Sequence, residues 1–145
     1  MSYWDTSALA KLYLPEPDSA DFVQKAASDA LMATARLTLY ELRRVAFRKE
    51  SEGFIPVGTA EAVLSQLEQD IAAGQIRLIE MDAQAEAEFN GVIAACYRRN
   101  PPLPIRTLDA LHLASARVSG QTELVGTDKR LRDAAKLRGC SVFPA

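Results

Sequence analysis

The chain has 145 residues, of which 48% are hydrophobic and 25% are charged, which suits one globular domain with one substantial core. Its net charge of −2 excludes a broad basic surface of the kind that binds nucleic acid tightly and nonspecifically, although basic residues cluster locally in 36–49 and 98–106. No apolar run approaches the roughly 20 residues that cross a bilayer. No basic segment precedes an apolar one at the N-terminus, so we expect a cytoplasmic protein without a signal peptide.

The chain begins with a strand, an acid and a helix. An apolar and aromatic run stops at Asp5, and the hydroxyls of Thr6 and Ser7 can cap a helix that runs through Leu12. Helical spacing and breaker residues predict further helices at 20–30, from 38, at 59–74, 82–100, 107–120 and 128–137. Short apolar or β-branched runs predict further strands at 31–34, 76–80, 123–127 and 141–143.

Strands that alternate with helices indicate a parallel sheet covered on both faces. The sequence therefore predicts a three-layer α/β/α sandwich with a central parallel sheet of four to five strands. Neither a linker, an internal repeat nor a low-complexity segment interrupts this pattern, so we expect residues 1–145 to form a single domain.

The two cysteines give no sign of a metal or redox site. Cys96 lies in a helical pattern and Cys140 near the C-terminus, without a CxxC spacing and with only His112 as a companion. A structural zinc site needs four such ligands. Two buried free thiols are therefore expected.

Four acids share one kind of position. Asp5, Glu41, Asp109 and Asp128 each lie just after a predicted strand or in the first turn of a predicted helix. In open α/β sheets ligands bind beyond the carboxyl ends of the strands, so acids at such junctions can take part in chemistry.

Helix capping competes with this explanation, because a helix N-terminus stabilises an anion by roughly 0.3 to 1 kcal/mol. Asp5 can act as a simple cap, and Thr38-x-x-Glu41 fits a capping box. Capping is not expected to explain Asp109 and Asp128, so the sequence favours a functional site built from the four acids.

The acids stand in motifs that together resemble the PIN domain, and within it the VapC-type ribonuclease toxins of prokaryotic toxin–antitoxin modules. The resemblance covers the whole chain, and the four motifs in this order and at these intervals are specific. They are Asp5-Thr6-Ser7-Ala8, Thr38-x-x-Glu41-Leu42, Asp109-Ala110-x-His112-Leu113-Ala114-x-Ala116 and Thr127-Asp128-x-x-Leu131.

This resemblance implies a metal-dependent endoribonuclease whose four catalytic acids are Asp5, Glu41, Asp109 and Asp128. It also implies a homodimeric toxin that a cognate antitoxin protein holds inactive. Phosphodiester hydrolysis needs an activated water and neutralisation of developing charge, and Mg²⁺ or Mn²⁺ held by carboxylates supplies both. We assign direct metal contacts to Asp5 and Asp109, and a second role, as ligands or as holders of water, to Glu41 and Asp128.

Nearby polar side chains receive more modest assignments. Thr6, Ser7 and Thr127 can support the metal or a phosphate by hydrogen bonding, but helix capping is the preferred explanation for each. His112 lies three residues beyond Asp109 on the same helical face, which is compatible with a general acid. The helix is apolar nearly all round, so a core histidine is the preferred interpretation.

Two other functional classes compete with the nuclease. A receiver-like phosphoacceptor also carries acids at strand ends, and Thr127-Asp128-Lys129 fits that pattern weakly, but neither Thr34 nor Glu80 supplies its lone acceptor aspartate. A non-catalytic PIN-like module that binds RNA or protein is the main alternative, because a fold does not fix a function. The presence of all four acids counts against it.

The connection Gly53-Phe54-Ile55-Pro56-Val57 places apolar residues between two amphipathic helices. An exposed apolar patch of this kind marks a binding surface, and folding back onto the core is the alternative. We assign Phe54 and Ile55 to a groove that receives an apolar helix of the antitoxin.

Overall fold

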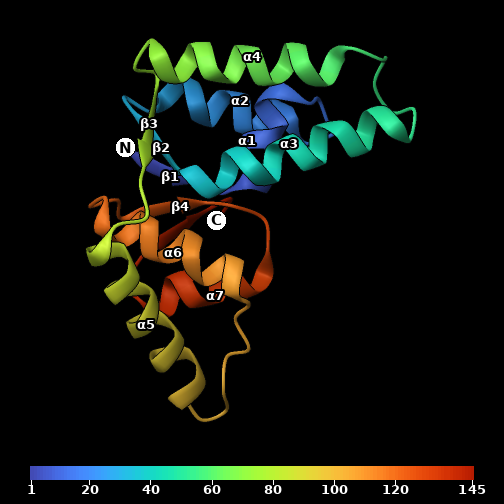
Figure 1. Ribbon diagram of the computed structural model, residues 1–145. Coiled ribbons are helices and arrows are strands. Elements are labelled where there is room, and N and C mark those ends of the chain that lie inside the picture. Colours follow the sequence, from blue (N-terminus) through green and yellow to red (C-terminus); the bar gives the residue numbers. More distant parts are fainter.

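Five short parallel strands form one sheet in the order β3-β2-β1-β4-β5, and seven helices cover it (Figure 1). The computed structural model describes all of residues 1–145. The strands are β1 (Ser2–Trp4), β2 (Met32–Ala35), β3 (Ile76–Ile79), β4 (Glu123–Val125) and β5 (Ser141–Phe143). The helices are α1 (Thr6–Tyr13), α2 (Ser19–Ser28), α3 (Arg36–Ser51), α4 (Thr59–Ala72), α5 (Ala83–Arg98), α6 (Thr107–Val118) and α7 (Lys129–Leu137). The predicted three-layer sandwich with a parallel sheet is confirmed.

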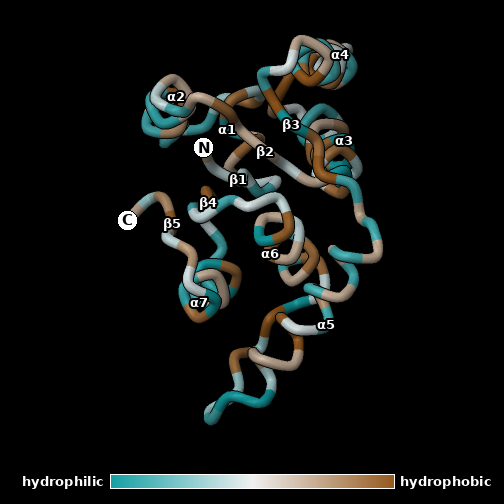
Figure 2. The backbone as a smooth tube through the Cα atoms, turned by 90° about the vertical axis from the view of Figure 1, so that its left-hand side faces the viewer, coloured by the Kyte–Doolittle hydropathy of each residue, from teal (hydrophilic) through white to brown (hydrophobic).

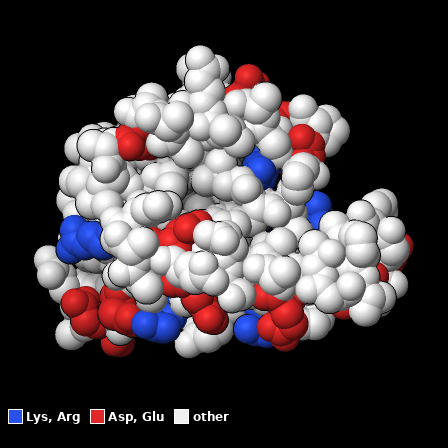
Figure 3. Space-filling model, turned by 90° about the horizontal axis from the view of Figure 1, so that it is seen from above, with Lys and Arg blue, Asp and Glu red and all other residues white.

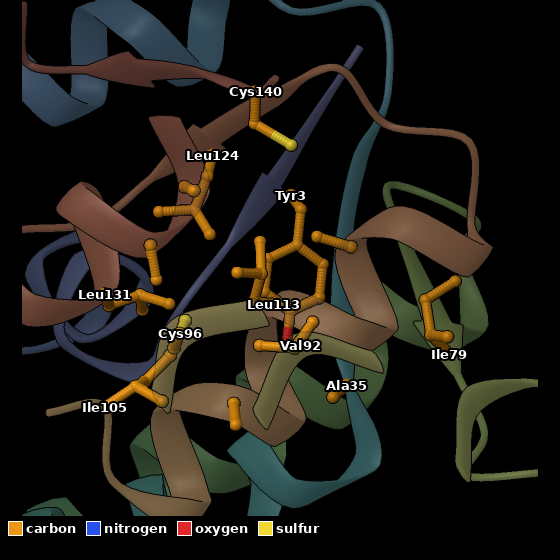
Figure 4. Packing of buried hydrophobic residues seen from close by; sticks show 14 of the residues in the cluster. Tyr3, Ala35, Ile79, Val92, Cys96, Ile105, Leu113, Leu124, Leu131 and Cys140 are labelled. Atoms are coloured by element: carbon orange, nitrogen blue, oxygen red, sulfur yellow. The ribbon is translucent and has the colours of Figure 1, made fainter. Parts of the chain in front are cut away.

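The helices divide into two groups, one on each face of the sheet. Helices α1 to α4 lie on one side of the strands and α5 to α7 on the other, as both views show (Figures 1 and 2). Successive residues of a strand point to opposite faces, and β1 follows this rule. Trp4 packs with the first group of helices, whereas Tyr3 lies among Val92, Leu113 and Leu124 on the other face (Figure 4).

The direction in which successive strands are added to the sheet reverses at β1. The connection from β1 leads to β2 and then outward to β3, while β4 pairs with the other side of β1 and leads to β5. Such a switch point leaves a crevice beyond the carboxyl ends of the two central strands, because their connections leave in opposite directions. In this molecule those strands are β1 and β4, which end at Trp4 and Val125.

The capping box expected at Thr38 and Glu41 is wrong. Strand β2 reaches Ala35, and α3 begins at Arg36 without an intervening loop, so Thr38 is already the third residue of the helix. The Thr34 hydroxyl lies within hydrogen-bond distance of both the Trp4 carbonyl oxygen and the Thr38 hydroxyl, at 2.7 Å each. These contacts tie the end of β2 to β1 and leave Glu41 free for another role.

Other predictions fall within a few residues of the structure. Asp82 caps α5 as expected, with its carboxylate accepting a hydrogen bond from the Ala85 N–H at 2.9 Å. Strand β4 ends two residues earlier than expected, before Gly126. Cys96 and Cys140 are buried free thiols, as predicted. No helix in the structure is both long enough and apolar enough to cross a membrane.

Candidate active site

A cavity of about 610 Å³ opens at the switch point, between α1, α3, the start of α6 and the loop before α7. All four predicted acids line it, although they come from positions spread between residues 5 and 128. We call the part around these acids the acidic end. The side chains of Lys11, Arg44, Arg48 and Lys49 line the remainder, which we call the basic end.

Asp5 is the most enclosed of the acids, with 4% of its surface exposed. It caps α1, because its Oδ1 accepts hydrogen bonds from the Ala8 N–H and the Ser7 hydroxyl, both at 2.8 Å. Burial raises the pKa of Asp5 above its usual value, and the nearby Asp109 carboxylate adds to the rise, while those two hydrogen bonds oppose it. The capping role and the position at the strand end therefore coexist in one side chain.

The backbone of Gly126 passes directly against the Asp5 carboxylate. A Cβ atom at Gly126 would lie 2.5 Å from Oδ2 and 2.8 Å from Cγ of Asp5, both too close for any side chain. The glycine is needed here for space, since its φ is not in the left-handed region. Gly126 directly precedes the Thr127-Asp128 motif, but its contact with Asp5 joins residues far apart in the chain and has no local signal.

Glu41 is held by two side chains from other elements. Its Oε1 lies 2.7 Å from the Thr6 hydroxyl, which donates to it, and 2.6 Å from Nε2 of His112. Burial opposes ionisation of Glu41, but the hydrogen bonds from His112 and Thr6 outweigh it and lower its pKa. Helix capping was the role preferred for Thr6 from the sequence. In the structure Asp5 caps α1, and Thr6 instead holds Glu41.

His112 is buried, as predicted for a core histidine, yet it also touches the site. Its Nδ1 lies 2.6 Å from the Tyr3 hydroxyl. Burial, with the charge of Asp5, raises the pKa of the Tyr3 hydroxyl. An ionised Glu41 carboxylate can only accept a hydrogen bond, so Nε2 is the donor in the contact with Glu41, and this makes His112 a positioning residue for that carboxylate.

Arg106 connects the remaining two acids. Its Nε lies 3.0 Å from Oδ2 of Asp109, and its Nη2 lies 3.1 Å from Oδ2 of Asp128. Asp109 is buried in α6, whereas Asp128 is partly exposed. Asp128 also caps α7 by accepting a hydrogen bond from the Leu131 N–H at 2.9 Å, so the expectation that capping does not explain Asp128 is wrong.

The arrangement of oxygens suits a hard divalent cation. Each of three acids uses only one of its two carboxylate oxygens for hydrogen bonds to side chains or backbone. Asp5 keeps Oδ2 free, Glu41 keeps Oε2 free and Asp109 keeps Oδ1 free, so each can offer one oxygen to another ligand. Carboxylate oxygens are the ligands that Mg²⁺ and Mn²⁺ prefer, and Mg²⁺ retains several waters, so few protein ligands suffice. As they stand, the side chains do not draw three or more acids, histidines or cysteines into one ligand cluster. The metal assignment stays a prediction.

The remaining predicted residues fall into two places. Ser7 and Thr127 line the cavity, and their hydroxyls lie 3.2 Å apart beside Asp5. Phe54 and Ile55 lie outside it, in the turn between α3 and α4. Phe54 is 75% exposed, while Ile55 is partly buried and packs against the core beneath the first group of helices.

The basic end was not foreseen as part of the site. Lys11 and Lys49 both pair with Glu16, with Nζ to carboxylate oxygen distances of 2.5 and 3.1 Å. These side chains come from α1, α3 and the turn after α1, so only the folded chain places them together. A view onto α4 shows acidic and basic groups interspersed without an extended basic surface (Figure 3).

Comparison with known proteins gives a family and a fold. The family model of the PIN domain matches residues 2–137. The chain is 34% identical over 149 aligned residues to a protein of Mycobacterium tuberculosis named Ribonuclease VapC35, and the alignment covers 98% of this chain and 95% of that protein.

Solved structures of low sequence identity share the fold. One is VapC20 of Mycobacterium tuberculosis, described as a toxin that cleaves the sarcin-ricin loop, with 18% identity, a TM-score of 0.68 and coverage of 92% of this chain and 95% of that one. Another is a toxin–antitoxin complex from Klebsiella pneumoniae, with 14% identity, a TM-score of 0.62 and coverage of 91% and 90%. At these identities the likeness concerns the fold alone.

Proposed function

This chain belongs to the PIN domain family, and we propose that it is an endoribonuclease that depends on Mg²⁺ or Mn²⁺. We further propose that it is the toxin component of a type II toxin–antitoxin system. The relative that shares 34% of its residues over nearly the full length of both chains is named a ribonuclease, and this supports the assignment of RNA as the substrate.

The observation that carries the proposal is the convergence of four acids on one cavity. Asp5, Glu41, Asp109 and Asp128 reach it from four different elements or loops, and three of them keep one carboxylate oxygen free of hydrogen bonds. A structural role alone accounts for the capping by Asp5 and Asp128, but it gives no reason to bury Asp109 beside Asp5. A non-catalytic module would have no need to keep the complete set.

The side chains have separate tasks in this chemistry. A divalent ion bound here supplies positive charge for the transferring phosphoryl group and makes water more acidic. Asp5 and Asp109, both buried, hold their carboxylates rigidly and would provide the main ligands. Thr6 and His112 hold Oε1 of Glu41, which lines the same cavity, and its other oxygen would accept a proton from the attacking water or hold that water in place.

The proposal of a toxin–antitoxin system also implies protein partners. A fold neighbour was solved as a toxin–antitoxin complex, which supports a cognate antitoxin for this chain. Phe54, with Ile55 behind it, would offer the antitoxin an apolar contact on the α3–α4 turn. We also propose that the chain forms a homodimer.

An RNA cleavage assay with and without EDTA tests the nuclease proposal. The purified protein is incubated with total RNA in Mg²⁺ or Mn²⁺, and new RNA ends are mapped. Cleavage that stops with EDTA and returns with added metal is the expected result, with Asp109→Asn inactive under all conditions. Binding of RNA without any cleavage would instead favour the non-catalytic module.

A further inference from the structure

The basic end of the cavity contains two arginines without any acidic partner. Lys11 and Lys49 pair with Glu16, and Arg106 pairs with two of the acids. Arg44 and Arg48 line the same cavity, yet their side chains form no ion pair or hydrogen bond, and both are exposed. The fold thus keeps two unpaired positive charges in a space whose other charges are nearly all paired.

Both arginines lie on the face of α3 that carries Glu41. Residues 41, 44, 45, 48 and 49 line the cavity, and this spacing is that of a single helical face. With a rise of 1.5 Å per residue, Arg44 lies about 4.5 Å and Arg48 about 10 Å beyond Glu41 along the helix axis. The arginines therefore form a row that leads away from the acids.

A polyanionic substrate needs such a row. The acidic end repels phosphate until a cation fills it, and the overall charge of −2 gives no general attraction for nucleic acid. Arginine presents a planar fork of donors that fits phosphate oxygens, and a side chain with no partner in the protein loses no ion pair when it binds one.

We propose that Arg44 and Arg48 form a phosphate subsite that holds the RNA backbone on one side of the cleaved bond. This inference rests on the proposed function, because it names where the strand lies in the same cavity. The subsite reads no base, so it orients the strand and contributes affinity without sequence preference. The direction of α3 from Glu41 to Arg48 then sets the path along which the strand leaves the acids.

Two double variants that remove equal charge test the subsite. Arg44→Gln/Arg48→Gln removes the proposed contacts. Arg36→Gln/Arg43→Gln is the control, because these arginines lie on the same helix but pair with Glu80 and Glu61 and line a different groove. Both variants and the wild type are titrated with a labelled single-stranded oligoribonucleotide in EDTA, where no cleavage occurs, over a series of salt concentrations.

The subsite predicts a selective loss. Arg44→Gln/Arg48→Gln should bind RNA about tenfold or more weakly, and the slope of log affinity against log salt should fall by about 1.4 for two lost phosphate contacts. In metal its KM should rise while kcat stays near the wild-type value. The control should match the wild type in each measurement.

The possible failures are distinct. Equal binding by Arg44→Gln/Arg48→Gln and the wild type overturns the subsite and leaves the nuclease proposal intact. Equal losses in both double variants also overturn it, because the effect would then be one of overall charge. Wild-type protein that binds RNA but never cleaves it in metal refutes the nuclease proposal, and the binding titration still decides the subsite. Wild-type protein that neither binds RNA in EDTA nor cleaves it in metal refutes both.

Discussion

The two ends of the cavity differ in burial and in how their charges are paired. At the acidic end Asp5 and Asp109 are almost closed to solvent, and Glu41 is held by Thr6 and His112. At the basic end Arg44 and Arg48 are exposed and unpaired. The acids proposed to hold an ion lie beyond the carboxyl ends of the central strands, whereas the arginines proposed to contact the RNA stand on the surface of α3. Changes at the acidic end should therefore affect the chemical step, and changes at the basic end should affect binding.

The largest effect is expected from Asp5→Asn. Loss of the charge of a main ligand should reduce RNA cleavage by about a thousandfold or more, because a bound metal stabilises the transition state by several kcal/mol. Asn can still accept the Ala8 hydrogen bond, so the circular dichroism spectrum should be unchanged.

The matched control for this variant is Asp82→Asn, since Asp82 caps α5 in the same way outside the cavity. It should keep full activity. The melting temperature adds a second readout: millimolar Mg²⁺ or Mn²⁺ should raise it in the wild type and in the control but not in Asp5→Asn. A wild-type melt that no metal shifts would contradict the site.

A smaller effect is expected from Gly126→Ala. The new Cβ must push the Asp5 carboxylate aside, since it would otherwise lie 2.5 Å from Oδ2. A misplacement of about 1 Å costs roughly a hundredfold in rate, and the crowding should also destabilise the fold by about 1 to 3 kcal/mol. Cleavage kinetics and denaturant unfolding measure the two effects.

Gly91→Ala serves as the comparison for this glycine. It adds the same methyl group to α5, where the nearest atom would be 3.8 Å away, which is an ordinary contact. Its activity should be unchanged and its stability equal or slightly higher, because alanine favours helix more than glycine. Full activity in Gly126→Ala would show that Asp5 does not need its present position.

Thr6→Val tests whether Glu41 needs to be held. The variant removes one of two hydrogen bonds to Oε1, so we expect cleavage to fall about tenfold and the metal concentration for half-maximal activity to rise. A purely structural threonine would change the melting temperature of the metal-free protein and leave the metal requirement alone. Thr107→Val, at an exposed helix start without a side-chain hydrogen bond, should behave like the wild type.

The smallest effect concerns the partner surface. Phe54→Ala should weaken antitoxin binding by roughly 1 kcal/mol or more, with cleavage by the free protein unchanged. Ile55→Ala should weaken it to a similar degree, but Ile55 also packs on the core, so its melting temperature must be measured alongside. Wild-type affinity in both variants, measured by titration with the antitoxin, would place the groove elsewhere.

The sequence was sufficient where a local pattern has one structural outcome. Alternating strands and helices fixed the parallel sheet, and the position of Asp5 after a strand placed it at the switch point. The capping box was predicted wrongly because Thr38-x-x-Glu41 can either start a helix or lie within its first turns. In the structure Thr38 is already inside α3, and its hydroxyl contacts the Thr34 hydroxyl, which also contacts the Trp4 carbonyl oxygen. No local pattern could distinguish these two arrangements.

The rest of the site depends on contacts between distant segments. His112 was correctly expected in the core, but its bond to Glu41 joins residues 71 positions apart. The ion pair of Arg106 with Asp109 is local, but its contact with Asp128 joins residues 22 positions apart, and no periodicity predicts that contact. The absence of ion-pair partners for Arg44 and Arg48 is also visible only in the folded molecule, because the sequence does not show which basic side chains meet an acid.

The pairing of β1 with β4 has a consequence for protein synthesis. Tyr3 and Trp4, at the start of the chain, align with Leu124 and Val125, and the cavity needs acids from both segments. A nascent chain that has emerged only as far as β3 carries Asp5 and Glu41 but neither Asp109 nor Asp128. All four acids can therefore line one cavity only after β4 has been synthesised and has paired with β1.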